Sequence, residues 1–360
     1  MKTRTLIPAI AAVGLAAVIG LTACSGSSDP GSTNGSSGGS GDIKIGLLLP
    51  ESKTTRYESF DRPLFEDKVK SLCSDCQVVY ANADQDASKQ QQQAESMLTQ
   101  GIKVMVLDPV DAKAAASIVS SATAQNVPVV SYDRLINAEN LAYYISFDNE
   151  KVGQLQGQAL VDKLKKDGAT GGILMVDGSP TDSNAAMFKK GAHSVIDSSG
   201  FSVLAEYDTP DWSPDKAQEW VAGQLTQFGG QLAGIYAAND GTAGGAVAAL
   251  KANGMTVPPL TGQDAELSAI QRIVAGDQYM TVYKAIKPEA EKAAEVAVSL
   301  AQGQTVSGDT QVDGVPSTLL NPVVVTVDNV KDTVVKDGFY TVDQICTAEY
   351  AAACKTAGLQ

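Results

Sequence analysis

Residues 129–134 read VVSYDR, an apolar run that ends in two opposite charges, Asp133 and Arg134. The run follows Pro128 and has the length and β-branched character of a buried strand. A salt bridge at a strand end would explain such a pair without any function. Its meaning therefore depends on whether other strands of the chain end in the same way.

Short apolar runs of this kind alternate with amphipathic stretches along the whole chain from residue 42. The expected strands are IKIGLLL, CQVVYAN, KVMVLDP, VPVVSYD, LAYYISF, GILMVDG, FSVLAEYD, LAGIYAAND, PPLTGQD and YMTVYK. Helical runs such as 114–125 and 244–253 follow most of them. The alternation predicts an α/β fold of βαβ units with parallel sheets. Roughly 320 residues exceed what one core usually supports, so two lobes are expected.

Nearly every expected strand ends in a polar cluster. The clusters are Asp108, Asp133–Arg134, Asp148–Asn149, Asp177, Asn239–Asp240 and Asp264. In open α/β sheets, ligands bind beyond the carboxyl ends of the strands. The clusters therefore predict one shared binding site, and VVSYDR is one member of the set.

The first residues carry an export signal. Lys2 and Arg4 precede an apolar run over residues 6–21, which ends in Leu-Thr-Ala-Cys at 21–24. The run is short and rich in small residues, as in a signal peptide over 1–23. Its end resembles the lipobox of bacterial lipoproteins, which implies that Cys24 is the first mature residue and carries a lipid. The Gly- and Ser-rich residues after it complete a flexible tether over 24–41.

The net charge and the cysteines disfavour several classes of function. Cleavage would remove Lys2 and Arg4 from the 27 basic residues, which leaves 25 − 41 = −16, a field that disfavours a nucleic-acid partner. Cys73 and Cys76 form a C-x-x-C pair, and Cys346 and Cys354 lie close in sequence. With a single histidine, a zinc site is disfavoured, and an extracytoplasmic setting favours two local disulfides. A redox role for the C-x-x-C pair is less favoured, because it lies between a helix and a strand.

Several long stretches carry a family resemblance. They are YDRLIN (132–137), YISFDNEKVGQLQGQALVDK (144–163), NDGTAGGAVAAL (239–250), GQDAELSAIQRIVAG (262–276), MTVYK (280–284) and VKDTVVKDGF (330–339). The chain resembles the periplasmic sugar-binding proteins of ABC transporters, and among them the D-xylose binders. The resemblance implies two doubly wound parallel-sheet lobes joined by three hinge crossings, near 146–149, 283–285 and 321–325. It places the lobes at 42–147 plus 285–321 and at 148–284 plus 322–360.

The resemblance also implies a set of ligand contacts. They are Arg56, Tyr57, Asp133, Arg134, Asp182, Asn184, Trp212, Asn239, Asp264 and Lys284. Tyr57 stands where the family has a larger aromatic residue, a departure that concerns selectivity for a pentose.

The chemistry of these residues suits an uncharged sugar. Three acids face three bases, so the site is expected to be near neutral, and charged partners make strong hydrogen bonds to hydroxyl groups. Tyr57 and Trp212 offer aromatic planes to the apolar faces of a pyranose ring. Each position has a simpler interpretation: Arg56 and Lys284 as solvated charges, Asp264 and Asn239 as turn or helix-cap residues.

Other motifs are expected to be structural. Trp220 lies at core spacing in a helical run and should be buried. The stretch NADQDAS from residue 82 lacks the glycine and closing glutamate of a calcium loop, so it predicts a helix start. His193 has no nucleophile in a matching motif and is expected to be structural.

Enzyme functions have little support in the sequence. There is no G-x-G-x-x-G after the first strand and no P-loop. A glycosidase would need a carboxyl with a raised pKa, and neither Asp133 nor Asp182 is expected to be one.

The sequence thus predicts a monomeric, lipid-anchored binding protein that delivers a monosaccharide, D-xylose first, to the permease of an ABC importer, without a cofactor. The alternative is a multi-sugar binder for glucose, galactose or arabinose whose closed form signals to a membrane sensor.

Overall fold

The protein is described by a computed structural model that covers residues 43–360, so the export signal, Cys24 and the tether lie outside the described residues. Its first lobe is built on a seven-stranded sheet in the order β10-β11-β5-β4-β3-β1-β2. The strands are β1 (Ile43–Leu49), β2 (Cys76–Asn82), β3 (Val104–Leu107), β4 (Val129–Tyr132), β5 (Tyr143–Phe147), β10 (Thr310–Val312) and β11 (Val315–Leu320). All pairings are parallel except β10 with β11.

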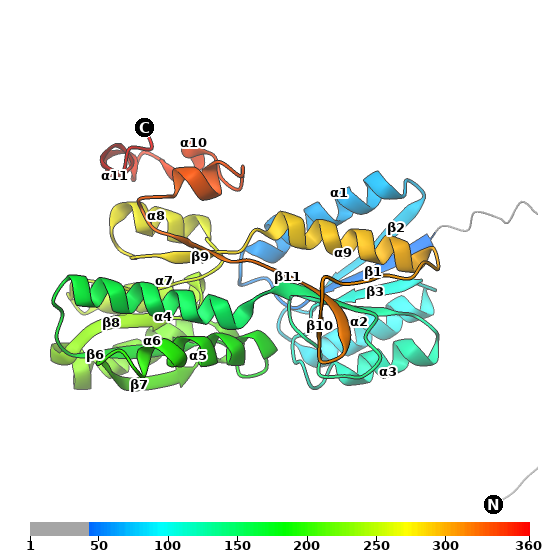
Figure 1. Cartoon of the computed structure of the whole chain (residues 1–360), viewed down its shortest axis with the longest axis horizontal. Helices are drawn as coiled ribbons and strands as arrows, with labels where there is room; N and C mark the ends of the chain where they lie inside the picture. The colour runs from blue at the N-terminus through cyan, green and yellow to red at the C-terminus, as the bar shows by residue number, and fades with distance from the viewer. Residues whose placement is uncertain (1–42) are drawn as a thin grey trace, which may run out of the picture. The chain divides into compact units, whose positions relative to one another are not determined.

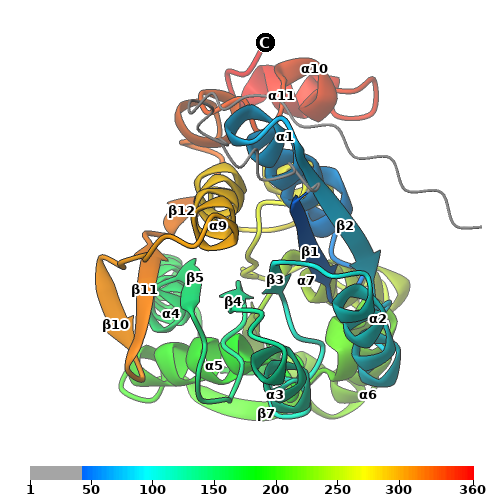
Figure 2. The ribbon, with the colours of Figure 1, turned by 90° about the vertical axis from the view of Figure 1, so that its right-hand side faces the viewer.

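Helices cover both faces of this sheet, as Figure 2 shows. One face holds α1 (Arg62–Leu72) and α9 (Ile286–Ala301), and the other holds α2 (Ala87–Thr99) and α3 (Ala116–Ala124). The apolar run of β1 serves both layers: Leu47 joins the core under α1 and α9, and Leu48 joins the core under α2 and α3. This two-sided burial explains why the strand is continuously apolar rather than alternating. As predicted, the stretch from residue 82 begins a helix, α2, capped by Asp86.

The second lobe is built on the parallel strands β6 (Gly172–Asp177), β7 (Ser202–Asp208) and β8 (Leu232–Ala237), in the order β7-β6-β8. Single bridges at Leu260 and Gln263 connect β8 to the antiparallel pair β9 (Thr281–Tyr283) and β12 (Val323–Val325). The prediction of a strand at PPLTGQD is therefore wrong, because only isolated bridges form there. The two prolines of this stretch have no N–H to donate to a ladder.

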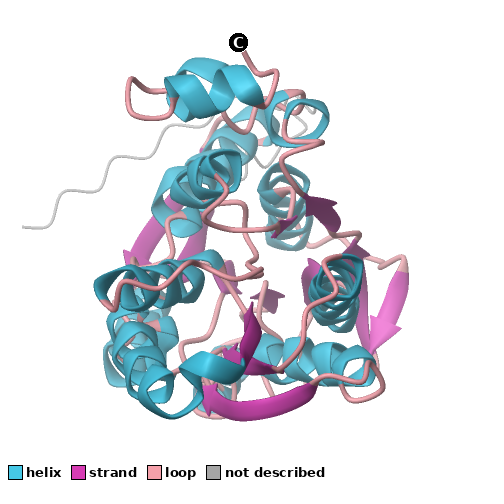
Figure 3. Cartoon of the chain, turned by 90° about the vertical axis from the view of Figure 1, so that its left-hand side faces the viewer, coloured by secondary structure: helices cyan, strands magenta, loops and turns pink. Residues whose placement is uncertain are grey.

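Helices again cover both faces of the second sheet (Figure 3). The pair α4 (Asn149–Lys166) and α5 (Ser183–Ile196) lies on one face, and the pair α6 (Pro214–Phe228) and α7 (Asp240–Ala252) lies on the other. Short helical turns, η2 (Pro210–Trp212) and η3 (Gly229–Gln231), flank α6. The result is a second doubly wound lobe, as the sequence predicts.

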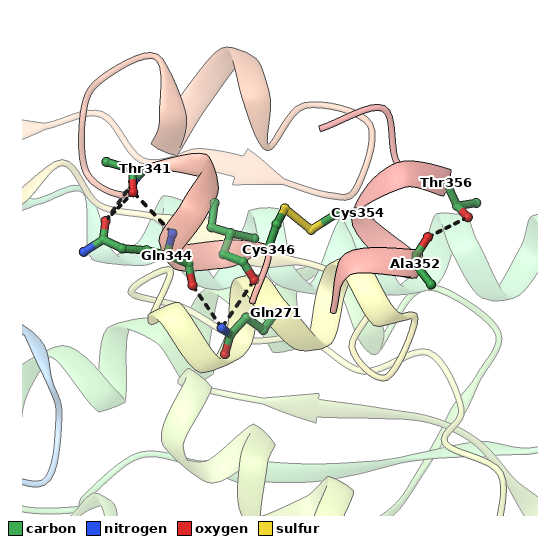
Figure 4. Close-up of a disulfide and its surroundings, with 8 residues drawn as sticks. Gln271, Thr341, Gln344, Cys346, Ala352, Cys354 and Thr356 are labelled. Carbon is green, nitrogen blue, oxygen red and sulfur yellow. Dashed lines mark hydrogen bonds between the residues drawn. A yellow bond between two sulfur atoms is a disulfide. The ribbon is translucent and has the colours of Figure 1, made fainter. Parts of the chain in front are cut away.

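The C-terminal segment packs on α8 (Leu267–Ala275) of the second lobe. It consists of η4 (Lys331–Val335), α10 (Val342–Ile345) and α11 (Ala351–Thr356). A disulfide between Cys346 and Cys354 joins the last two helices (Figure 4). A second disulfide links Cys73 and Cys76 between α1 and β2. Both predicted local disulfides are confirmed.

The chain passes between the lobes three times, as Figure 1 shows. The passages lie between β5 and α4, between β9 and α9, and between β11 and β12. They coincide with the three predicted crossings, whereas the residue limits assigned to the lobes stay a prediction. Among residues 43–360, no helix combines the length and apolar character needed to cross a membrane.

Candidate ligand-binding site

All ten side chains predicted from the sequence line one cavity between the lobes, whose empty space is about 270 Å³. Thr54, Phe188 and Gln263 complete its wall. The cavity lies where strands of both sheets end, because β4, β6 and β8 are each followed by a loop that contributes to it. The cavity therefore lies where the rule that ligands bind beyond the carboxyl ends of strands places a site.

Asp133 is the centre of the hydrogen-bond network. It lies directly after β4 with a positive φ of 54°, a conformation that aspartate tolerates better than most residues. Its Oδ2 accepts from Arg56 Nη1 at 3.1 Å and from the Tyr57 hydroxyl at 3.4 Å, and its Oδ1 accepts from Asn184 Nδ2 at 3.1 Å. Burial would raise the pKa of Asp133, but the charges of Arg56, Lys284 and Arg134 outweigh it and hold that pKa below its usual value.

The charged pair that ends VVSYDR has two different roles. Arg134 extends across the cleft, and its Nε lies 2.9 Å from Asp182 Oδ2 in the second lobe. Its Nη1 donates to the Pro109 carbonyl at 3.1 Å and its Nη2 to the Tyr57 hydroxyl at 3.1 Å. Asp133 and Arg134 are therefore not a simple salt bridge with each other, and each links the first lobe to the second.

Asp182 and Trp212 form one wall from the second lobe. Asp182 caps α5 by accepting from Asn184 N at 2.8 Å, and its Oδ2 accepts from Trp212 Nε1 at 2.9 Å. Trp212 itself has a positive φ of 52°, a strained conformation for a bulky residue. Its ring lies so close to Gly178 that a Cβ there would be 2.1 Å from the ring, so only glycine fits. Contacts within the second lobe thus hold the indole in place.

Lys284 and Asp264 form the opposite ion pair, with Nζ 3.0 Å from Oδ1. Asp264 has a φ of 90°, and Lys284 follows β9 at a crossing. Burial would lower the pKa of Lys284, but Asp264 and Asp133 raise it, so the amine stays charged. Asn239 caps α7 through its Oδ1, which leaves its side-chain nitrogen as the group available to a ligand. Asn239 is thus both a helix cap and a wall residue.

The cavity wall carries the predicted three acids and three bases, and further carboxyl groups lie behind it. Arg56 also pairs with Asp61 at 2.6 Å and with Glu289 at 2.6 Å, and Asp108 lies 3.5 Å from Arg134. Six buried carboxyl groups therefore surround three cations. Burial raises the pKa values of Asp108 and Glu289 well above their usual range, which favours their neutral forms and offsets part of the excess charge.

The expectation that Asp182 has no raised pKa needs correction. Burial raises its pKa, although Arg134 opposes the rise, so a raised pKa does occur in the site. Its hydrogen bonds come from a tryptophan and a helix N-terminus, and they fix the position of the carboxyl group.

Three residues of the site and its surroundings, Phe188, Gln263 and Glu289, were not predicted from the sequence. Phe188 lies four residues after Asn184 on α5, so helical spacing places both on one face. Gln263 adjoins Asp264, and its Oε1 is buried without a partner. Glu289 lies in a helix whose sequence has an ordinary amphipathic pattern. Only the structure shows that its side chain lies near the cavity.

The second tryptophan is less buried than predicted. Trp220 is half-buried and stacks on Tyr207 at 5.3 Å between ring centroids, within the second lobe. The next residue along the helix, Val221, is the one that enters the core. His193 lies outside the cavity, with Nδ1 2.9 Å from Asp197 and Nε2 3.2 Å from Glu206.

Comparisons with known proteins agree with this geometry. Residues 45–305 match the family model of the periplasmic binding protein domain. The D-xylose-binding periplasmic protein of Escherichia coli is 39% identical over 308 residues, which cover 83% of this chain and 91% of that protein. The multiple sugar-binding periplasmic receptor of Rhizobium radiobacter is 31% identical, over 84% of this chain and 92% of that protein. A solute-binding protein of Clostridium phytofermentans with bound β-D-glucose has a TM-score of 0.76 and 28% identity, over 84% of this chain and 99% of that one.

Two doubly wound lobes around a shared polar cavity define a type I periplasmic binding protein. This chain belongs to the periplasmic binding protein family, and within it to the sugar-binding proteins of ABC transport. Its relatives are extracytoplasmic substrate-binding proteins, which supports a binding function rather than catalysis.

Proposed function

We propose that this protein is a lipid-anchored extracytoplasmic receptor that closes on a monosaccharide, D-xylose first, and delivers it to the permease of an ABC importer. The observation that carries the proposal is the cavity itself, in which donors, acceptors and aromatic rings from both lobes converge. Each sugar hydroxyl is a donor and an acceptor, so it needs partners of both kinds once water is excluded. The buried pairs of the site supply both.

The enclosure of the cavity argues for a single sugar ring. Side chains of both lobes form its walls, and Arg134 pairs with Asp182 between the lobes. A disaccharide would need the lobes to stay apart, which would cost the Arg134–Asp182 contact. We therefore expect monosaccharides to bind and disaccharides to bind weakly or not at all.

D-xylose is favoured over other sugars by the likeness to D-xylose-binding proteins from two organisms, at 39% and 38% identity. The second candidate, a multi-sugar receptor with a signalling role, is favoured by the 31% identity to the multiple sugar-binding receptor and by the glucose-bound solved relatives. Tyr57, smaller than the aromatic residue implied by the resemblance, leaves room for either.

Isothermal titration calorimetry of the purified mature chain against a sugar panel separates these candidates. D-xylose should bind most tightly, and Arg56→Ala should abolish binding. Arg62→Ala is the matched control, because Arg62 lies on the surface six residues away, where it pairs with Glu58 and Glu66 and lies over the Tyr80 ring. Tighter binding of glucose or galactose would favour the multi-sugar receptor, and failure of every monosaccharide would refute both.

The lipid anchor is tested separately. Cells that express the protein are fed a radioactive fatty acid, and the protein is recovered from the membrane fraction. The wild type should carry the label, and Cys24→Ser should carry none. A labelled Cys24→Ser variant would exclude Cys24 as the site of lipidation.

A further inference from the structure

Four aromatic rings meet outside the ligand cavity, at a contact between the two lobes. Phe60 stacks on Phe339 with ring centroids 4.2 Å apart and meets the edge of Tyr340 at 5.8 Å. Phe339 also contacts Tyr283 at 5.2 Å. None of these four side chains lines the cavity. The ligand site as described so far gives them no function.

The rings come from segments that also shape the cavity. Phe60 belongs to η1 (Tyr57–Asp61), the turn of helix that holds Tyr57 and begins after Arg56. On the other side, Phe339 contacts Tyr283, the residue before Lys284, and Tyr340 packs in one core cluster with Ala265, the residue after Asp264. The aromatic contact therefore joins one cavity-forming loop of the first lobe to one of the second.

The rings that Phe60 contacts, Phe339 and Tyr340, belong to a segment held in place by contacts within the second lobe. Phe339 and Tyr340 lie between η4 and α10, in the segment that packs on α8. Gln271 of α8 donates to the carbonyls of Gln344 and Ile345 at 3.2 and 3.3 Å, and the Cys346–Cys354 disulfide joins α10 to α11, as Figure 4 shows. The disulfide thus lies on the segment that positions the two rings.

We infer that Phe60, docked on Phe339 and Tyr340, is a latch that stabilises the closed arrangement of the lobes, and that the Cys346–Cys354 disulfide holds its receiving surface in place. The inference rests on the proposed function where it concerns sugar affinity. A contact present in the closed form and lost on opening adds its full free energy to binding by shifting the population of closed molecules. It acts on release of the sugar more than on its capture.

The first experiment compares Phe60→Leu with Phe228→Leu. Phe228 is a partly buried ring that packs only within the second lobe, so its loss is a control for removing an aromatic group. Stopped-flow and calorimetric measurements should show about tenfold weaker D-xylose binding for Phe60→Leu, mainly through faster dissociation, and wild-type binding for the control. Equal affinities in the two variants would overturn the latch.

The two disulfides provide a second matched pair. Cys346→Ser with Cys354→Ser should weaken binding several-fold, and combining it with Phe60→Leu should add little, because both changes remove the same contact. Cys73→Ser with Cys76→Ser, in the first lobe, should leave affinity unchanged. Equal effects of the two pairs would contradict the assigned role of the C-terminal disulfide.

Solution X-ray scattering of the ligand-free proteins tests the latch without any sugar. Phe60→Leu should have a larger radius of gyration than the wild type and Phe228→Leu, because its lobes open more often. Identical radii would overturn the latch even if sugar binds. If no monosaccharide bound the wild type, the proposed function would fail, and the scattering result would still decide on the latch.

Discussion

At the scale of single residues, the cavity is held by carboxyl groups whose charge depends on their partners. Asp133 keeps a low pKa because three cations lie near it, and Glu289 has a raised pKa because burial outweighs Arg56. Carboxyl groups in one site therefore have pKa values that are shifted in opposite directions. The effect of a substitution should therefore depend on which charged partner it leaves unpaired.

Asp264→Ala leaves Lys284 with one distant partner, Asp133 at 3.9 Å, in a closed cleft. We expect a loss of sugar affinity of about 3 kcal/mol, which is more than 100-fold, because an unpaired buried charge costs more than one hydrogen bond. Calorimetry measures it. Asp277→Ala, which removes a comparable lysine pair at the surface, should leave affinity unchanged. Binding by Asp264→Ala within a few-fold of wild type would place Asp264 outside the site.

Glu266 provides a prediction on pH and stability. Burial and the neighbouring Asp240 and Asp264 raise its pKa from 4.5 to about 8. Between these two values the folded protein retains a proton that the unfolded chain has lost, so rising pH destabilises the fold up to about pH 8 and no further. Glu266→Gln removes this effect. Its stability relative to wild type should rise by at least about 1 kcal/mol from pH 5 to pH 9.

Denaturant unfolding of the ligand-free protein at the two pH values provides the measurement. The exposed Glu219→Gln is the control and should show no such trend. A Glu266→Gln variant whose stability relative to wild type did not change with pH would show that Glu266 is ionised in the folded protein.

At the scale of elements, η2 fixes the tryptophan of the cavity. Pro210 begins this turn and Pro214 begins α6, so the intervening backbone has little freedom. We expect closure to bring Trp212, which lines the cavity, against the ligand, whereas Trp220 contacts Tyr207 of its own lobe and should not change its surroundings.

Tryptophan fluorescence should therefore respond to saturating sugar through Trp212. The signal should persist in Trp220→Phe and largely vanish in Trp212→Phe. Trp212→Ala should also weaken binding at least tenfold, because it removes a stacking plane and the donor to Asp182. A signal that vanished in Trp220→Phe and survived in Trp212→Phe would place the ligand elsewhere.

The strands and the polar residues that follow them could be predicted from the sequence. A buried parallel strand is a continuous apolar run, and the loop that lines the cavity begins directly after it. VVSYDR illustrates both. Asp61 and Glu289 were not accessible, since they reach Arg56 from helices whose sequences carry no such mark. PPLTGQD was misassigned because its prolines allow bridges but no ladder. The position of the Trp212 ring depends on Gly178, which is distant in sequence.

At the scale of the whole molecule, the two lobes meet along the cleft through direct contacts. Ala112 N donates to the Thr181 carbonyl at 3.0 Å, Asn184 donates to Asp133, and Arg134 pairs with Asp182. The cavity exists because these contacts bring both walls together. A sugar that completes the remaining hydrogen bonds would stabilise this closed arrangement.

A crystal structure of the mature chain grown with D-xylose tests the central claim most directly. We predict one sugar ring enclosed between the lobes, near Tyr57 and Trp212, with its hydroxyl groups hydrogen-bonded to Asp133, Asp264 and Lys284. The lobes should keep the Arg134–Asp182 contact. A sugar bound outside this cavity, or a cavity without sugar at saturating D-xylose, would contradict the account.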